Sequence, residues 1–168
     1  MLRILKYYIL LIILIIIQNT FIWLISVSEY NIVPDLVLVG VLLMGIKRGK
    51  IEGMLSGFFA GLTLDITAGS FLGLLALIYT LMGFTAGFFQ ETKDKEKTLS
   101  RKQFMLLIAV ISFISNFIYF QIYFLTAASI HSFLEIIYIY VLPSTVYTLL
   151  ISIIYILIPG GRQLNSSY

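Results

Sequence analysis

The polar side chains that could do chemistry in this chain are few, and they lie close to the ends of long apolar runs. Asp35 opens one apolar segment and Asp65 closes the next, while Gln18 and Asn19 come late in the first segment and Glu135 opens the last. Two carboxylates can work as an acid and a base, and ionisable groups in apolar segments usually face a bundle interior or a wet cavity. The pattern predicts an outward-opening polar pocket lined by Asp35 and Asp65, with Gln18, Asn19 and Glu135 at the same end.

A simpler interpretation of these carboxylates stays open. Asp35 directly follows Pro34, and a carboxylate in the first turn of a helix meets the positive end of the helix dipole. On this interpretation Asp65 is a residue at the entry to a loop and Glu135 lies in headgroup water.

Other chemical signatures are missing from the sequence. The chain has no cysteine and a single histidine, His131. It carries no H-E-x-x-H motif, no G-x-S-x-G motif and no P-loop. We therefore predict no catalytic residue, no metal site and no cofactor, and we expect that the protein is not an enzyme.

The composition indicates that most of the chain lies in lipid. Hydrophobic residues make up 60% of the sequence and charged residues 11%, and the mean hydropathy is +1.04. A soluble domain carries about 25% charged residues. A chain of this length could not hide so much apolar surface from water, so the sequence predicts an integral membrane protein.

Hydropathy divides the chain into one all-α domain, residues 1–168, with six transmembrane helices. The helices are expected at about 4–25, 33–46, 51–67, 71–89, 104–125 and 133–158, and residues 90–103 form a charged loop. The second segment is short for a full span. Pro143 lies inside the sixth segment, where we expect a kink. The apolar run near the N-terminus is interpreted as a retained span, since it shows no signal-peptide cleavage pattern.

Charge gives the orientation of these six segments. All 11 lysines and arginines fall in the loops and ends on one side of the predicted membrane. Such residues prefer the cytoplasmic side. We therefore expect a multi-pass protein of the bacterial cytoplasmic membrane with both termini in the cytoplasm. A re-entrant pair formed by the second and third segments would place Lys47–Lys50 on the wrong side.

Glycines recur at a spacing of four residues in the third and fourth segments. Small residues at this spacing let helix backbones approach closely in lipid. We predict that the helices pack through Gly53, Gly57, Gly61, Gly69, Gly73, Gly83 and Gly87.

The stretch from Pro34 to Phe89 resembles the MreD family of bacterial rod shape-determining membrane proteins. The resemblance rests on PDLVLV at 34–39, the basic turn KRGK at 47–50, GMLSGFFAGLTLD at 53–65, GSFLG at 69–73 and GFTAG at 83–87. Pro34, Asp35, Gly57, Gly61, Asp65 and Gly69 match as motif positions, with no catalytic role implied.

This resemblance implies a non-enzymatic component of the cell-elongation complex that builds the lateral peptidoglycan wall. The implied partners are an MreC-like bitopic protein and, indirectly, MreB-like filaments and the peptidoglycan polymerase/transpeptidase pair, together with membrane lipids and no nucleic acid. It also implies a fold similar to the substrate-binding subunits of energy-coupling-factor (ECF) transporters. The alternative function is a vitamin-binding subunit of such a transporter, but the first segment lacks the small residues that those subunits use to dock their partner.

Overall fold

The chain folds into six helical rods in a computed structural model that describes residues 2–25, 33–68, 71–90, 101–126 and 132–157. In chain order the elements are α1 (Leu2–Ile25), α2 (Leu36–Arg48), α3 (Lys50–Ala68), α4 (Leu74–Ala86) with the 3-10 turn η1 (Gly87–Phe89), α5 (Arg101–Thr126), and a last rod made of α6 (Phe133–Glu135), the π-helical η3 (Ile136–Val141) and α7 (Leu142–Leu157). The described residues contain no strand, which confirms the prediction of an all-helical chain.

The rods follow the expected segments closely in sequence. Their bounds differ from the expected ranges by at most three residues at either end. Two described stretches, Lys102–Thr126 and Phe133–Ile153, are long and apolar enough to cross a membrane. The transmembrane assignment of all six segments stays a prediction.

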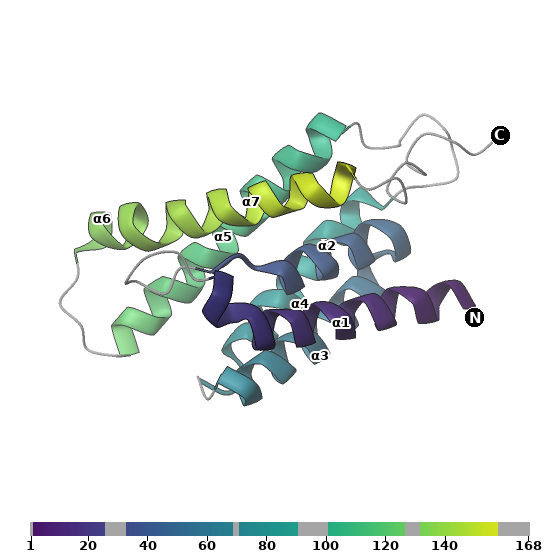
Figure 1. Cartoon of the computed structure of the whole chain (residues 1–168), viewed down its shortest axis with the longest axis horizontal. Helices are drawn as coiled ribbons and strands as arrows, with labels where there is room; N and C mark the ends of the chain where they lie inside the picture. Colours follow the sequence, from purple (N-terminus) through teal and green to yellow (C-terminus); the bar gives the residue numbers. More distant parts are fainter. Residues whose placement is uncertain (1, 26–32, 69–70, 91–100, 127–131, 158–168) are drawn as a thin grey trace.

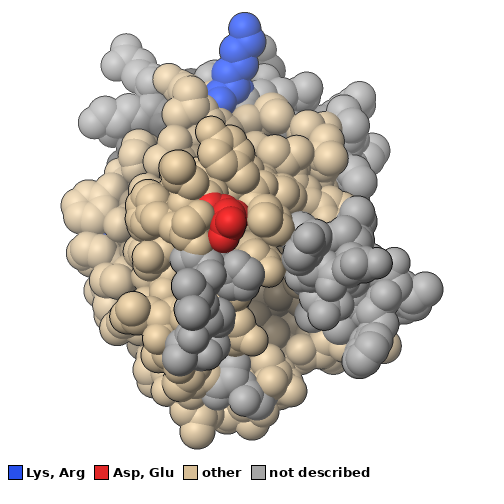
Figure 2. All heavy atoms as spheres, turned by 90° about the vertical axis from the view of Figure 1, so that its left-hand side faces the viewer, with Lys and Arg blue, Asp and Glu red and all other residues tan. Residues whose placement is uncertain are grey.

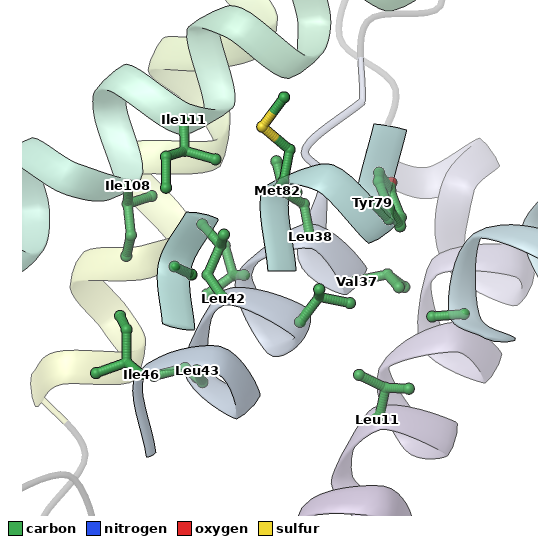
Figure 3. Close-up of a cluster of buried hydrophobic side chains, with 14 of the residues drawn as sticks. Leu11, Val37, Leu38, Leu42, Leu43, Ile46, Tyr79, Met82, Ile108 and Ile111 are labelled. Atoms are coloured by element: carbon green, nitrogen blue, oxygen red, sulfur yellow. The ribbon is translucent and has the colours of Figure 1, made fainter. Parts of the chain in front are cut away.

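Helix α2 is the central element of the bundle. Its residues Val37–Ile46 are all buried, and it packs against α1, α3, α4, α5 and α7. Figure 3 shows the side chains of Leu38, Leu42 and Ile46 among those of the surrounding helices. The continuous apolar run LVLVGVLLMGI explains this position, because a helix that is apolar on every face is stable only when neighbours or lipid surround it.

The helices run back and forth along one direction. In Figure 1 the start of α1, the turn between α2 and α3 and the end of α7 lie toward the same side of the view. That turn contains Gly49, whose φ of 101° lies in the left-handed region that glycine enters without a Cβ penalty. Its backbone N–H closes α2 through a 2.8 Å hydrogen bond to the Gly45 carbonyl.

Helices α3 and α4 approach each other through glycines. A Cβ added at Gly53 or Gly57 would run into the backbone carbonyl oxygens of Gly83 and Tyr79 respectively, and one added at Gly61 would lie 2.5 Å from the Leu75 carbonyl oxygen. Helix α2 joins this contact, since a Cβ at Gly45 would lie 2.6 Å from the Gly83 carbonyl oxygen. Direct backbone contact of this kind gives van der Waals attraction that larger side chains would prevent.

The last rod contains a π-helical segment immediately before Pro143. Residues Ile136–Val141 are π-helical, and the Leu142 N–H reaches back to the Ile137 carbonyl. Proline has no N–H, and its ring collides with the carbonyl four residues earlier in a regular helix. The π-helical segment directly before Pro143 agrees with this effect, while the expected kink stays a prediction. The segment packs against an aromatic cluster where the Phe124 and Tyr140 ring centroids are 4.8 Å apart.

Candidate functional site

The polar residues of interest gather at the N-terminal end of the central helix. Asp35 is the N-cap of α2, and its Oδ1 accepts a 2.9 Å hydrogen bond from the Leu38 backbone N–H. Its other oxygen, Oδ2, accepts a 2.6 Å hydrogen bond from the hydroxyl of the buried Tyr79 on α4. One carboxylate thus starts α2 and links it to α4.

Two further helices contribute hydrogen-bond acceptors at the start of α2. The Val37 N–H donates to Gln18 Oε1 on α1 at 3.0 Å, and the Asp35 N–H donates to Thr148 Oγ1 on α7 at 3.0 Å. The first N–H groups of a helix have no partner within it. Here side chains from other helices accept from them, and we refer to Gln18, Asp35, Tyr79 and Thr148 together as the Asp35 node.

Asp65 has a different set of partners. Its carboxylate is fully buried and accepts hydrogen bonds from the backbone N–H groups of Gly73 at 2.9 Å, Leu75 at 3.1 Å and Ala76 at 3.1 Å. These N–H groups form the start of α4, so a residue near the end of α3 caps the following helix. A carboxylate there also meets the positive end of the α4 dipole.

The two aspartates are therefore connected through α4, and a pocket lined by both stays a prediction. Asp65 caps the N-terminus of α4, and Asp35 binds Tyr79 further along the same helix. Each carboxylate accepts hydrogen bonds from the protein itself, as the simpler interpretation of Asp35 as a helix-start charge expects. In the described residues the hydrogen bonds of the two aspartates hold α2, α3 and α4 in position relative to one another.

The other three predicted site residues each have a different hydrogen-bond partner. Asn19 Oδ1 accepts a 3.3 Å hydrogen bond from the Thr67 hydroxyl, which joins α1 to the end of α3. Gln18 belongs to the Asp35 node. Glu135 is exposed and forms a capping box with Ser132, in which the Ser132 N–H donates to Glu135 Oε2 at 3.0 Å.

Glu135 belongs to α6, at an end of the molecule where few of the described side chains are charged. Among the described residues it is the one exposed carboxylate. Figure 2 views the molecule from the left-hand side of Figure 1, where α6 begins. It shows one acidic spot, in red, and basic atoms, in blue, only at the top of the view, while the other described atoms on this face are uncharged.

The predicted packing glycines separate into two groups. Gly53, Gly57, Gly61, Gly83 and Gly87 all lie where an added Cβ would meet the backbone of a neighbouring helix or turn. Gly73 does not take part in this packing, because a Cβ there would meet no atom within 4 Å. Its φ of 98° turns the chain so that its N–H meets Asp65. Gly69 lies outside the described residues, as does His131.

Tyr79, Thr148 and Gly45 were missed by the sequence reasoning. Tyr79 is one of 11 tyrosines, and nothing in its neighbourhood distinguishes it. Thr148 belongs to a visible pattern, since Ser144, Thr148 and Ser152 recur every four residues on α7 and are all buried. A run of small polar residues on one face of an apolar helix is a signal for interhelical hydrogen bonding.

The arrangement holds helices in place and offers few groups for other chemistry. Within the described residues there is no group of three His, Cys, Asp or Glu side chains that could hold a metal ion. Buried polar groups that are hydrogen-bonded within the protein specify how helices pack.

Comparison with known proteins identifies the family of this chain. A family model described as rod shape-determining protein MreD matches residues 1–159. No curated protein matches. No solved structure matches either, so a similarity to ECF transporter subunits stays a prediction.

Proposed function

Because the chain belongs to the MreD family of rod shape-determining membrane proteins, we propose that it serves as a non-enzymatic scaffold in the bacterial cell-elongation complex. The family match over residues 1–159 carries the cell-shape part of this proposal. The scaffold part rests on one structural observation, which is that both membrane aspartates accept hydrogen bonds from the protein's own groups.

The partner proposed for this scaffold is an MreC-like bitopic protein. Through it the protein would act with MreB-like filaments and with the peptidoglycan polymerase/transpeptidase pair. The role needs a rigid membrane body that presents fixed surfaces. The glycine contacts between α3 and α4, together with hydrogen bonds that join α2 to α1, α4 and α7, support such a body.

Depletion of the protein in its native host tests this function. We expect cells to widen and round, and a tagged wild-type copy to restore rods and to co-purify with a bitopic MreC-like protein. Rod-shaped cells after complete depletion would contradict the proposal. Co-purification with an ATPase module in place of the bitopic protein would favour the transporter alternative.

The proposed orientation places six spans in the cytoplasmic membrane with both termini inside the cell. It is supported by the one-sided distribution of lysine and arginine and by the start of α1 and the end of α7, which lie toward the same side in Figure 1. The chain has no native cysteine, so single cysteines can report accessibility without background.

The orientation experiment compares two such cysteines. We expect Lys97→Cys to react with an impermeant maleimide only after the cells are opened, and His131→Cys to react in intact cells. Labelling of both in intact cells, or the reverse order, would contradict six spans with cytoplasmic ends.

A further inference from the structure

Helix α4 carries an exposed apolar stripe that ends at a lysine. Leu77, Leu81, Phe84 and Phe88 are spaced by four, three and four residues, and they are exposed by 60%, 49%, 37% and 60% respectively. This spacing places them on one helix face. The Phe84 and Phe88 rings meet edge to face at a centroid distance of 5.1 Å, which shows that the face continues into η1.

Lys50, at the start of α3, lies over the end of this stripe. Its Nζ is 3.5 Å from the centre of the Phe88 ring and 6.0 Å from that of Phe84. The side chain is exposed, and no described carboxylate forms an ion pair with it. A cation over a ring face uses one side of the ammonium, so its remaining N–H groups can donate to a ligand.

The length of the stripe matches one leaflet of a membrane. From Leu77 to Phe88 the helix rises about 16 Å at 1.5 Å per residue, and half of the hydrocarbon core is about 15 Å. An acyl chain lying along the stripe would therefore bring its headgroup to Lys50. An acidic peptide would fit the lysine but would leave the apolar stripe without a complement.

We propose that the α4 stripe and Lys50 form a binding seat for one anionic phospholipid of the inner leaflet. The acyl chains pack along Leu77, Leu81 and Phe84, and the phosphate accepts hydrogen bonds from the Lys50 ammonium held by Phe88. The choice of the inner leaflet rests on the proposed orientation, which puts Lys50 on the cytoplasmic side, and Lys47 and Arg48, close to Lys50 in the sequence, add to the formal positive charge there.

Native mass spectrometry and thermal unfolding of the purified full chain in detergent test this seat. We expect added phosphatidylglycerol to give more bound lipid and a higher unfolding temperature than phosphatidylcholine does. Lys50→Gln should reduce that preference about fivefold, the scale of one lysine near an anionic surface, and Lys50→Arg should retain it. The matched control is Lys102→Gln, which removes an exposed lysine at the start of α5, away from the stripe, and should reduce the preference clearly less than Lys50→Gln does.

Several outcomes would contradict the proposed lipid-binding seat. One is equal stabilisation by the two lipids, and another is a Lys50→Gln variant that keeps the wild-type preference. Inorganic phosphate at the same concentration should not stabilise the protein, and if it does so as well as the lipid, the apolar stripe has no part in binding. If Lys50→Gln unfolds in detergent before lipid is added, Phe88→Leu provides the second test, because it keeps an apolar side chain but removes the ring that holds the ammonium.

Discussion

Asp65 and Gly73 are joined by a 2.9 Å hydrogen bond from the Gly73 N–H to the Asp65 carboxylate, across the corner between α3 and α4. Gly73 can make it because its φ of 98° turns the N–H inward, and the same carboxylate accepts from Leu75 and Ala76. An anion that receives several backbone N–H groups at a helix start is a strong cap. Asp65 is thus a structural support for α4 in this fold.

We expect Asp65→Ala to destabilise the protein severely. It removes the acceptor of three backbone N–H groups, of which that of Ala76 is buried and those of Gly73 and Leu75 are part-buried. An unsatisfied buried group costs about 1–3 kcal/mol. The Ala76 N–H alone therefore sets a loss of about 1–3 kcal/mol, to which the two part-buried groups add, visible as a lower unfolding temperature in detergent and a lower protein level in cells.

Glu135→Ala is the control for the loss of a capping carboxylate. Its capping box is exposed, so the loss should be about 1 kcal/mol or less. A folded Asp65→Ala protein at normal level that fails to maintain cell shape would contradict the capping role and favour the pocket hypothesis.

Asp35 and Tyr79 should be energetically coupled. The Tyr79 hydroxyl donates to Asp35 Oδ2 at 2.6 Å, and interhelical hydrogen bonds in membrane proteins average about 0.6 kcal/mol with a maximum near 1.7. We expect a double-mutant cycle with Tyr79→Phe and Asp35→Asn to give a coupling energy of about 1 kcal/mol. The measurement is unfolding in detergent of the two single variants and the double variant.

Tyr138→Phe supplies the comparison for this cycle. It removes the hydroxyl of a tyrosine that is 67% exposed and should show no coupling with Asp35→Asn. Strict additivity of Tyr79→Phe and Asp35→Asn would mean that the short hydrogen bond does not help to hold α2 against α4.

Much of this fold could be predicted because lipid imposes simple rules on a helix. The long apolar runs predicted the six helical segments, and the spacing of Gly53, Gly57 and Gly61 indicated a helix face for close packing. The simpler interpretation of Asp35, as the charged start of a helix, could also be made from Pro34 and the apolar run that follows. These features depend on residues that are near one another in sequence.

The features that could not be predicted depend on contacts between distant segments. Sequence spacing does not fix the separation of Asp35 and Asp65, and it does not show that Tyr79 lies beside one of them. Gly73 shares the small-residue spacing of the packing glycines, but the path of the chain places it in a turn where an added Cβ has open space. Only the assembled helices distinguish a packing glycine from a turn glycine.

Gly57→Ala should separate α3 from α4. The new methyl group would meet the Tyr79 carbonyl oxygen, and a backbone atom cannot move aside as a flexible side chain can. We expect a loss of about 1–3 kcal/mol, the usual cost of overpacking, measured as a lower unfolding temperature. Gly73→Asn is the comparison, because the site is open and asparagine tolerates positive φ, so its loss should be smaller. Equal losses in the two variants would argue against close packing at Gly57.

Thr148→Val tests whether α7 is held to the central helix through the Asp35 node. Valine keeps the shape of threonine but removes the oxygen that accepts from the Asp35 N–H at 3.0 Å. The Thr148 side chain is 1% exposed and its hydrogen bond to the Asp35 N–H is part-buried, so we expect a loss of about 1 kcal/mol in detergent unfolding.

The matched control for Thr148→Val is Thr80→Val. The Thr80 hydroxyl donates only within its own helix, to the Ala76 carbonyl at 2.5 Å, and that carbonyl keeps its place in the helix when the hydroxyl is removed. Thr80→Val should therefore change stability by less than about 0.5 kcal/mol. A Thr148→Val variant as stable as Thr80→Val would show that the hydrogen bond between α7 and α2 contributes nothing measurable, and that the other contacts of α7, above all those with α5, hold the last rod in place.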